Sequence, residues 1–211
     1  MMSYASKQAG ILAPRVLGCY DVEPEVIVTV TDLIRGESLD KVWHTMDKSQ
    51  RNSIKAQLKD QLRLFRTCTQ PYIGRINRQP TLNFYDRLDF NFMGPFDSEE
   101  DFDNWCLARV KSSIILWKRL LPKMRGKNGE RNFVLTHGDL AARNIMVNDG
   151  KGYGDRGLGV QRVLSGIYGV CTSNRDNDCQ EDWWKPVLKE ILEPCGFQRS
   201  RFSAAIKNRG W

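Results

Sequence analysis

Histidine is scarce in this chain, and its cysteines show no metal-binding arrangement. There are two histidines, and none of the six cysteines forms a C-x-x-C pair. A structural zinc site takes its four ligands mainly from these two residue types, commonly at such paired spacing. The sequence therefore argues against a zinc site. We expect reduced thiols that lie mostly in or near the core.

Long hydrophobic runs are also missing. The longest, such as 26–30 and 114–117, are far shorter than the roughly 20 residues that cross a bilayer. The first residues do not show a basic segment followed by an apolar one, which is the pattern of a secretion signal. We therefore expect a cytoplasmic protein that does not enter a membrane.

The length and charge indicate a globular protein with a basic surface. The chain has 211 residues, 41% of them hydrophobic, enough for one substantial domain or a small lobe packed on a larger one. The net charge is +7, but basic residues alternate with acidic ones and no aromatic and basic platform accompanies them. A solvated basic surface, or a site for anionic phosphate, explains this better than nucleic-acid binding. The nucleic-acid alternative would use Lys111, Lys118, Arg119, Lys123, Arg125 and Lys127.

The residue patterns predict both strands and helices. Strands are expected at 26–34, which is rich in β-branched residues, at 11–20, which contains a proline near its start, and over the short ranges 133–136 and 145–147. Apolar residues at helical spacing predict helices over these ranges: 38–46, 48–67, 98–121 and 182–192. Ser98 and Asp101 resemble a capping box at the start of the third helix.

Three other stretches differ from these elements. The range 152–177 holds six glycines and shows no helix or strand pattern, and the basic tail after Phe197 is expected to be loose. The range 70–97 is long and irregular, with three prolines, and loops of this length are usually functional. Four aromatic residues there could line a pocket, although packing under the loop is the favoured interpretation: Tyr85, Phe90, Phe92 and Phe96.

The spacing His137-x-Asp139-x-x-x-x-Asn144 is that of the catalytic loop of kinases. There an aspartate orients the acceptor hydroxyl and takes its proton, and the asparagine five residues later holds a magnesium ion on the phosphates. An Asx-rich turn between strands would explain Asp139 and Asn144 about as often. A histidine beside a strand end is more often a hydrogen-bonded core residue than a proton shuttle.

The flanking sequences carry a more specific signal. They are V-L-T-H-G-D-L-A-A-R-N-I-M-V, V-T-D-L-I-R-G-E-S-L, Y-I-G, G-P-F-D-S-E-E-D-F and D-W-W-K-P-V-L-K-E-I-L. Together they resemble the aminoglycoside phosphotransferase family, specifically its fungal small-molecule-kinase-like members. The resemblance covers roughly residues 8–150 and 181–196.

This resemblance implies an α+β fold of the protein-kinase-like type and an ATP-dependent phosphotransferase that acts on a small-molecule hydroxyl. Asp139 would be the catalytic base, Asn144 a magnesium ligand and His137 a residue that braces the loop. The range Asp32, Leu33 and Ile34 would be the hinge that contacts adenine through backbone groups. The acceptor remains open, and antibiotic resistance is not implied.

The same resemblance implies a division of the chain into three parts. Residues 1–36 would be a remnant of the N-terminal lobe with the hinge, 37–196 the helical C-terminal lobe, and 197–211 a basic tail. The family's glycine-rich turn and phosphate-binding lysine precede its hinge. Only 31 residues precede Asp32, so we expect this phosphate-clamping half of the small lobe to be missing from the sequence.

A second departure follows the catalytic loop. The family needs an aspartate for magnesium a few residues after the asparagine, in an apolar setting such as I-D-W. Here the chain reads G-Y-G-D-R-G-L-G-V-Q-R-V-L-S-G-I-Y-G-V over 152–170. Asp155 is its only acid, and Gly154, Arg156 and Gly157 supply no apolar packing.

The genetic code suggests a cause for this departure. Reading the codons of 152–170 from their second base permits V-T-G-I-V-D-W-G-F-S-G-F-Y-P-E-Y-M-E-Y, which resembles the missing metal-site segment. We hypothesise that residues from about 151 to between 171 and 181 are out of frame, with the family frame regained by Trp183. A lineage-specific insertion loop is the alternative. The chain as it reads is therefore expected to transfer phosphate weakly or not at all, and a non-catalytic, pseudokinase-type binding protein is the alternative function.

Overall fold

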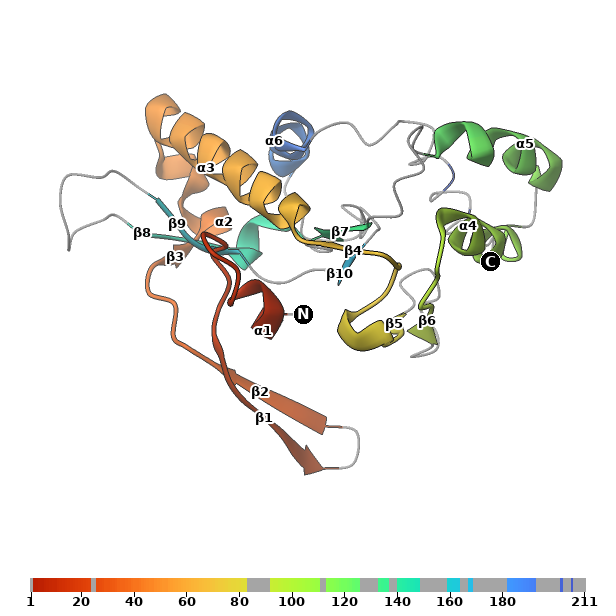
Figure 1. The fold of residues 1–211 in the computed structure, drawn as a ribbon. Helices are drawn as coiled ribbons and strands as arrows, with labels where there is room; N and C mark the ends of the chain where they lie inside the picture. Colours follow the sequence, from red (N-terminus) through yellow and green to blue (C-terminus); the bar gives the residue numbers. More distant parts are fainter. Residues whose placement is uncertain are drawn as a thin grey trace. The chain divides into compact units, whose positions relative to one another are not determined.

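A computed structural model describes residues 2–23, 26–82, 92–110, 113–125, 133–136, 140–148, 159–163, 167–168, 182–192, 202 and 206 (Figure 1). The chain divides into two compact units. Unit 1 comprises 1–68, 135–166 and 170–193, and unit 2 comprises 69–134, 167–169 and 194–211.

Unit 1 begins with a short helix, α1 (Met2–Ala5), and an antiparallel pair, β1 (Val16–Glu23) and β2 (Val26–Thr31) (Figure 1). The first strand was expected at 11–20 but starts later, because Pro14 has no N–H to donate to a ladder. It also continues through Glu23, where a D-V-E-P turn was expected. The second strand ends at Thr31 rather than at residue 34, and the last backbone hydrogen bond between the two segments runs from the Asp32 N–H to the carbonyl of Arg15 (3.0 Å).

A second sheet of unit 1 has the order β3-β8-β9. Its strands are β3 (Glu37–Ser38), β8 (Ile145–Asn148) and β9 (Gly159–Val163), and both pairings are antiparallel. Gly36 makes the approach to this sheet possible. Its φ is +117°, and a Cβ at this position would collide with the carbonyl oxygen of Val147.

Two helices cover the core of unit 1. α3 (Lys48–Thr67) coincides with its expected range, and its start is fixed by a capping box between Asp47 and Gln50. α6 (Trp184–Ile191) lies within the expected 182–192. Between β3 and α3 the chain forms α2 (Leu39–Val42) and the 3₁₀ turn η1 (Trp43–Thr45). The buried core residues are Leu39, Trp43, Met46, Ile54, Leu58, Leu140, Ala142, Ile145, Val147, Trp184, Val187, Leu188 and Ile191.

Unit 2 consists of short strands and two helices. A three-stranded sheet has the order β10-β7-β4, from β10 (Ile167–Tyr168), β7 (Phe133–Thr136) and β4 (Thr69–Gln70). Residues 133 and 134 of β7 belong to unit 2, and residues 135 and 136 belong to unit 1. β5 (Thr81–Leu82) pairs with β6 (Phe92–Met93), and the 3₁₀ turn η2 (Ile76–Arg78) precedes β5. The helices are α4 (Glu99–Leu107) and α5 (Ile114–Met124).

Three expectations need correction. The single helix over 98–121 is two helices, because Ser113 adopts the left-handed conformation (φ 59°), which cannot continue a helix. Strands β9 and β10 fall in the range where no pattern was seen; β8 offers backbone groups to β9, which contains the β-branched Val160 and Val163. In the tail, Phe202 and Ile206 are buried rather than loose.

Helices and strands together are compatible with an α+β protein. Within the residues described, no helix combines the length and apolar character required to cross a membrane. Cys68 and Cys106 are buried free thiols as expected, whereas Cys19 is exposed. The other three cysteines lie outside the described residues.

Candidate functional site

The predicted catalytic loop lies in the chain between β7 and β8. His137 and Asp139 are outside the described residues, so their predicted roles are not tested. Asn144 is the last residue of the 3₁₀ turn η3 (Ala142–Asn144) and is half-buried. Its backbone N–H donates to the carbonyl of Ala141 at 3.0 Å. The exit of the loop is therefore an ordered turn that leads directly into β8.

The exit of the loop is anchored from α6. Trp184 donates its indole Nε1–H to the carbonyl oxygen of Leu140 at 2.9 Å, and the two residues are only 1% and 6% exposed. Leu140 follows Asp139 directly in the sequence. A buried carbonyl without a donor would be costly, so this indole stabilises the chain where it leaves the predicted catalytic residue.

The predicted hinge is an extended segment between β2 and β3. The Asp32 carboxylate accepts from the Arg15 amide at 2.7 Å, which ties the start of the hinge to the segment before β1. Leu33 is 87% exposed. In the described part of the chain, the amides of Leu33 and Ile34 form no hydrogen bond with another backbone group.

The strands that follow the hinge and the catalytic loop in the sequence pair with each other in one sheet. β3 follows the hinge and β8 follows Asn144, and they pair through Glu37 with Val147 and Ser38 with Met146. The structure thus joins the segments that follow two of the predicted site regions, both within unit 1.

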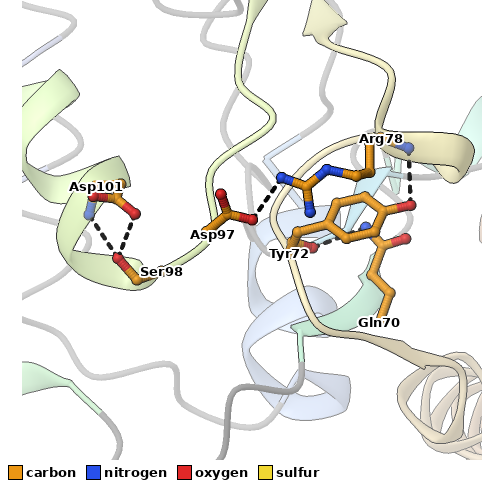
Figure 2. A network of polar contacts seen from close by, with 6 residues as sticks. All are labelled: Gln70, Tyr72, Arg78, Asp97, Ser98 and Asp101. Carbon is orange, nitrogen blue, oxygen red and sulfur yellow. Dashed lines mark hydrogen bonds and ion pairs between the residues drawn. The ribbon is translucent and has the colours of Figure 1, made fainter.

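Within the irregular range 70–97 of unit 2, polar contacts join several of the described residues (Figure 2). Gln70 donates its amide nitrogen to the carbonyls of Tyr72 (2.9 Å) and Gly74 (3.0 Å). Arg78 donates to Asp97 at 2.6 Å and lies over the Tyr72 ring, 5.0 Å from its centre. The Tyr72 hydroxyl accepts from the Arg78 amide at 3.0 Å.

The aromatic residues of this segment do not behave alike. Phe96 packs against Phe102 and Trp105 of α4, with ring centres 5.5 and 5.9 Å apart, which agrees with packing under the loop. Phe92 is 57% exposed, and Arg75 lies over its ring. Tyr85 and Phe90 lie outside the described residues. A pocket for an acceptor remains a prediction.

Arg125, one of the basic residues of the nucleic-acid alternative, is already engaged. Its Nε donates to Asp103 at 3.0 Å, and its terminal nitrogen lies 3.4 Å from Glu100. Asp103 is fully buried. This arginine therefore neutralises two acids of α4 and is not available to contact phosphate groups without breaking that pair.

The comparison with protein families identifies the chain. The model of the Phosphotransferase enzyme family (APH) matches residues 2–155, which is well over half of the chain. The chain therefore belongs to this family, and the resemblance inferred from its motifs is confirmed at that level. Membership implies a protein-kinase-like fold. No curated protein matches the chain in sequence.

The family generally uses ATP and Mg²⁺. The described residues can therefore be compared with the ligands that this ion requires. Among the described residues, no group of three or more His, Cys, Asp or Glu side chains could hold a metal. Asn144 offers one amide oxygen, and the β9 sequence G-V-Q-R-V offers no carboxylate. Magnesium prefers six oxygen ligands, with carboxylates among those a protein supplies. Of the residues that the family resemblance assigns to the ion, the described part of the chain contains only Asn144.

Sequence reasoning missed the role of Trp184. The W-W pair was recognised only as the opening of a helix, because the partner of the second indole lies 44 residues earlier in the chain. The available signal was composition: a tryptophan fully buried in a core usually finds an acceptor for its N–H. That rule predicts a partner but not its identity.

Proposed function

We propose that this chain derives from an ATP-dependent phosphotransferase that acts on a hydroxyl group of a small molecule in the cytoplasm. We also propose that the chain, as its sequence reads, transfers phosphate weakly or not at all. The observation that carries both statements is the family match over residues 2–155. The matched range includes the H-x-D-x-x-x-x-N loop. It ends within residues 152–170, where the family's metal carboxylate is expected.

In the proposed reaction, Asp139 accepts the proton of the acceptor hydroxyl while that oxygen attacks the terminal phosphorus of ATP. The bond from this phosphorus to the bridging oxygen breaks, and ADP leaves. His137 braces the loop by hydrogen bonding. The backbone groups of Asp32, Leu33 and Ile34 face the adenine, and the free amides of Leu33 and Ile34 in the described part of the chain suit this role.

The expected weakness follows from electrostatics. Phosphoryl transfer depends mainly on positioning and on stabilising charge that spreads over the transferred group. Asn144 would be one magnesium ligand, and Mg²⁺ would neutralise phosphate charge when bound. For the second, carboxylate ligand the range 152–170 offers only Asp155, whose neighbours Gly154, Arg156 and Gly157 supply none of the apolar packing expected around it.

The frame hypothesis explains this absence. The family match ends at residue 155, close to the proposed change of frame at about 151. Beyond the proposed return to frame, α6 is again a core element: Trp184 and Ile191 are only 1% and 4% exposed. A segment of foreign frame between two stretches that suit the family accounts for both facts.

The test compares two chains for magnesium-dependent consumption of ATP with a panel of alcohols and amines. The first is the chain as printed. The second, called the restored chain, carries the shifted-frame segment in place of residues 152–170, together with any codons that the transcript holds upstream of Met1.

The restored chain should consume ATP with at least one acceptor, and Asp139→Ala should abolish this, while the printed chain shows little or no turnover. Absence of turnover in the restored chain with every acceptor would remove the proposed activity. Equal turnover in both chains would contradict the role given to the missing carboxylate.

A further inference from the structure

Trp184 and Leu140 are joined by a buried hydrogen bond. The indole Nε1–H of Trp184 donates to the Leu140 carbonyl at 2.9 Å, across 44 residues of sequence, and both residues are buried. Backbone carbonyls in a core need a donor, and a buried one that loses it pays a desolvation penalty. The position of the Leu140 carbonyl is therefore linked to the position of the indole.

The indole itself cannot move freely. Its ring meets Trp43 edge to face, with centres 6.3 Å apart and planes at 82°, and it meets Trp183 at 5.3 Å and 67°. The helix that carries it is tied to α3 by the ion pair of Lys55 and Glu190 at 2.8 Å. A donor whose rotamer is locked by packing imposes its geometry on the acceptor.

The adjacent tryptophan provides an internal comparison. Trp183 stacks on Trp43, with ring centres 4.9 Å apart and planes at 15°. Its own Nε1 is buried, and it has no hydrogen-bond partner in the structure described. The two indoles thus share one aromatic cluster, but only that of Trp184 donates to the backbone beside the predicted catalytic loop.

We propose that Trp184 is a positioning residue, whose indole N–H holds the carbonyl of Leu140 and so restrains the backbone that follows Asp139. This inference rests on the proposed function for its catalytic meaning, since Asp139 matters only if the family reaction takes place. The restraint on the loop, however, is a property of the printed chain and is measurable without turnover.

The first measurement is hydrogen exchange of the peptide that covers residues 137–144, followed by mass spectrometry, in Trp184→Phe and Trp183→Phe. Both variants keep an aromatic ring in the cluster, but only Trp184→Phe leaves the Leu140 carbonyl without its donor. Exchange of the loop should rise about tenfold in Trp184→Phe, the order expected for one lost buried hydrogen bond. It should stay within about twofold in Trp183→Phe. Equal increases in the two variants, or none in Trp184→Phe, would overturn the proposal.

A second measurement covers the case in which Trp184→Phe fails to fold. In the unsubstituted chain labelled with ¹⁵N and ¹³C, the Trp184 Nε1 nucleus should show a through-hydrogen-bond coupling to the carbonyl carbon of Leu140. Trp183 should show none. Absence of the Trp184 coupling at a sensitivity that detects the backbone hydrogen bonds of α3 would also overturn the proposal.

Turnover of the restored chain separates this inference from the proposed function. There, Trp184→Phe should lower kcat about tenfold with the KM for ATP unchanged, whereas Trp183→Phe should alter neither. If Trp184 had only a structural role, the substitution would lower the fraction of folded enzyme. In that case kcat per active site, counted by active-site titration, would stay unchanged. If no variant turns over, the proposed function fails and the exchange result still decides whether Trp184 restrains the loop.

Discussion

The Nζ atom of Lys55 lies 2.8 Å from the Oε2 atom of Glu190, and this ion pair joins α3 to α6. The hydrogen bond from Lys55 holds the pKa of Glu190 below its ordinary value of 4.5, with a smaller contribution from the charge of Lys59; partial burial opposes the shift. A carboxyl whose pKa is lowered on folding stabilises the folded state at pH values above its unfolded pKa. That stability is lost as the pH falls through the folded pKa.

Glu190→Gln should therefore lower the free energy of unfolding slightly at pH 7 and have no effect once the pH lies below the lowered pKa of this carboxyl. Urea titrations of the two chains between pH 7 and the acid limit of folding measure this. Lys55→Met should show the same pH dependence, and in the double variant the two effects should not add. A Glu190→Gln effect that persists unchanged at acid pH would contradict the pairing. High salt should reduce the effect at pH 7, because the glutamate is half exposed.

Gly36→Ala should destabilise unit 1. The residue has a φ of +117°, and an added Cβ would meet the carbonyl oxygen of Val147 in β8. We expect a loss of about 1–3 kcal/mol in the free energy of unfolding, seen as a lower urea midpoint at unchanged slope. Ser38→Ala is the control: this side chain makes no capping hydrogen bond, and its loss should cost less than about 0.5 kcal/mol. Equal midpoints for the two variants would show that the approach of Gly36 to β8 is not restrictive.

Arg125→Met should destabilise unit 2 strongly. It removes the arginine partner of Asp103, a fully buried carboxylate, across α4 and α5. Breaking a buried pair from one side costs about 3–5 kcal/mol. Arg63→Met is the control, because Arg63 pairs with Asp60 at 3.0 Å on an exposed surface, where a pair contributes about 0–1 kcal/mol. Urea titrations of both variants measure these changes. Similar losses in the free energy of unfolding for the two variants would contradict the role assigned to Arg125.

The sequence predicts those elements whose signals are local. The range of α3 follows from the spacing of Ile54, Leu58 and Phe65, all of which are buried. The start of α4 follows from Ser98, which accepts from the Asp101 amide at 3.0 Å. The break before α5 escaped detection because apolar residues continue at helical spacing on both sides of it, while the deciding feature is the backbone conformation of Ser113.

The candidate site itself stays a prediction, for which the sequence supplies the names of the residues. The loop motif is one continuous run of sequence and the hinge is another, so the residues of each could be named. What anchors them is not contiguous: the indole of Trp184 reaches Leu140, and β3 reaches β8, only after the chain has folded. Such contacts depend on the packing of distant elements, and no local pattern encodes the partner.

The most direct test of the central claim is to sequence the transcript from upstream of the codon for Met1 through the codon for Trp183. We predict a single-base or splice difference that restores the reading I-V-D-W in the range 152–170 and returns to the present frame by Trp183. The family's metal carboxylate would then be part of the natural protein. A message that encodes G-Y-G-D-R-G-L-G as printed would contradict this claim, and it would leave a family member whose own sequence lacks that carboxylate.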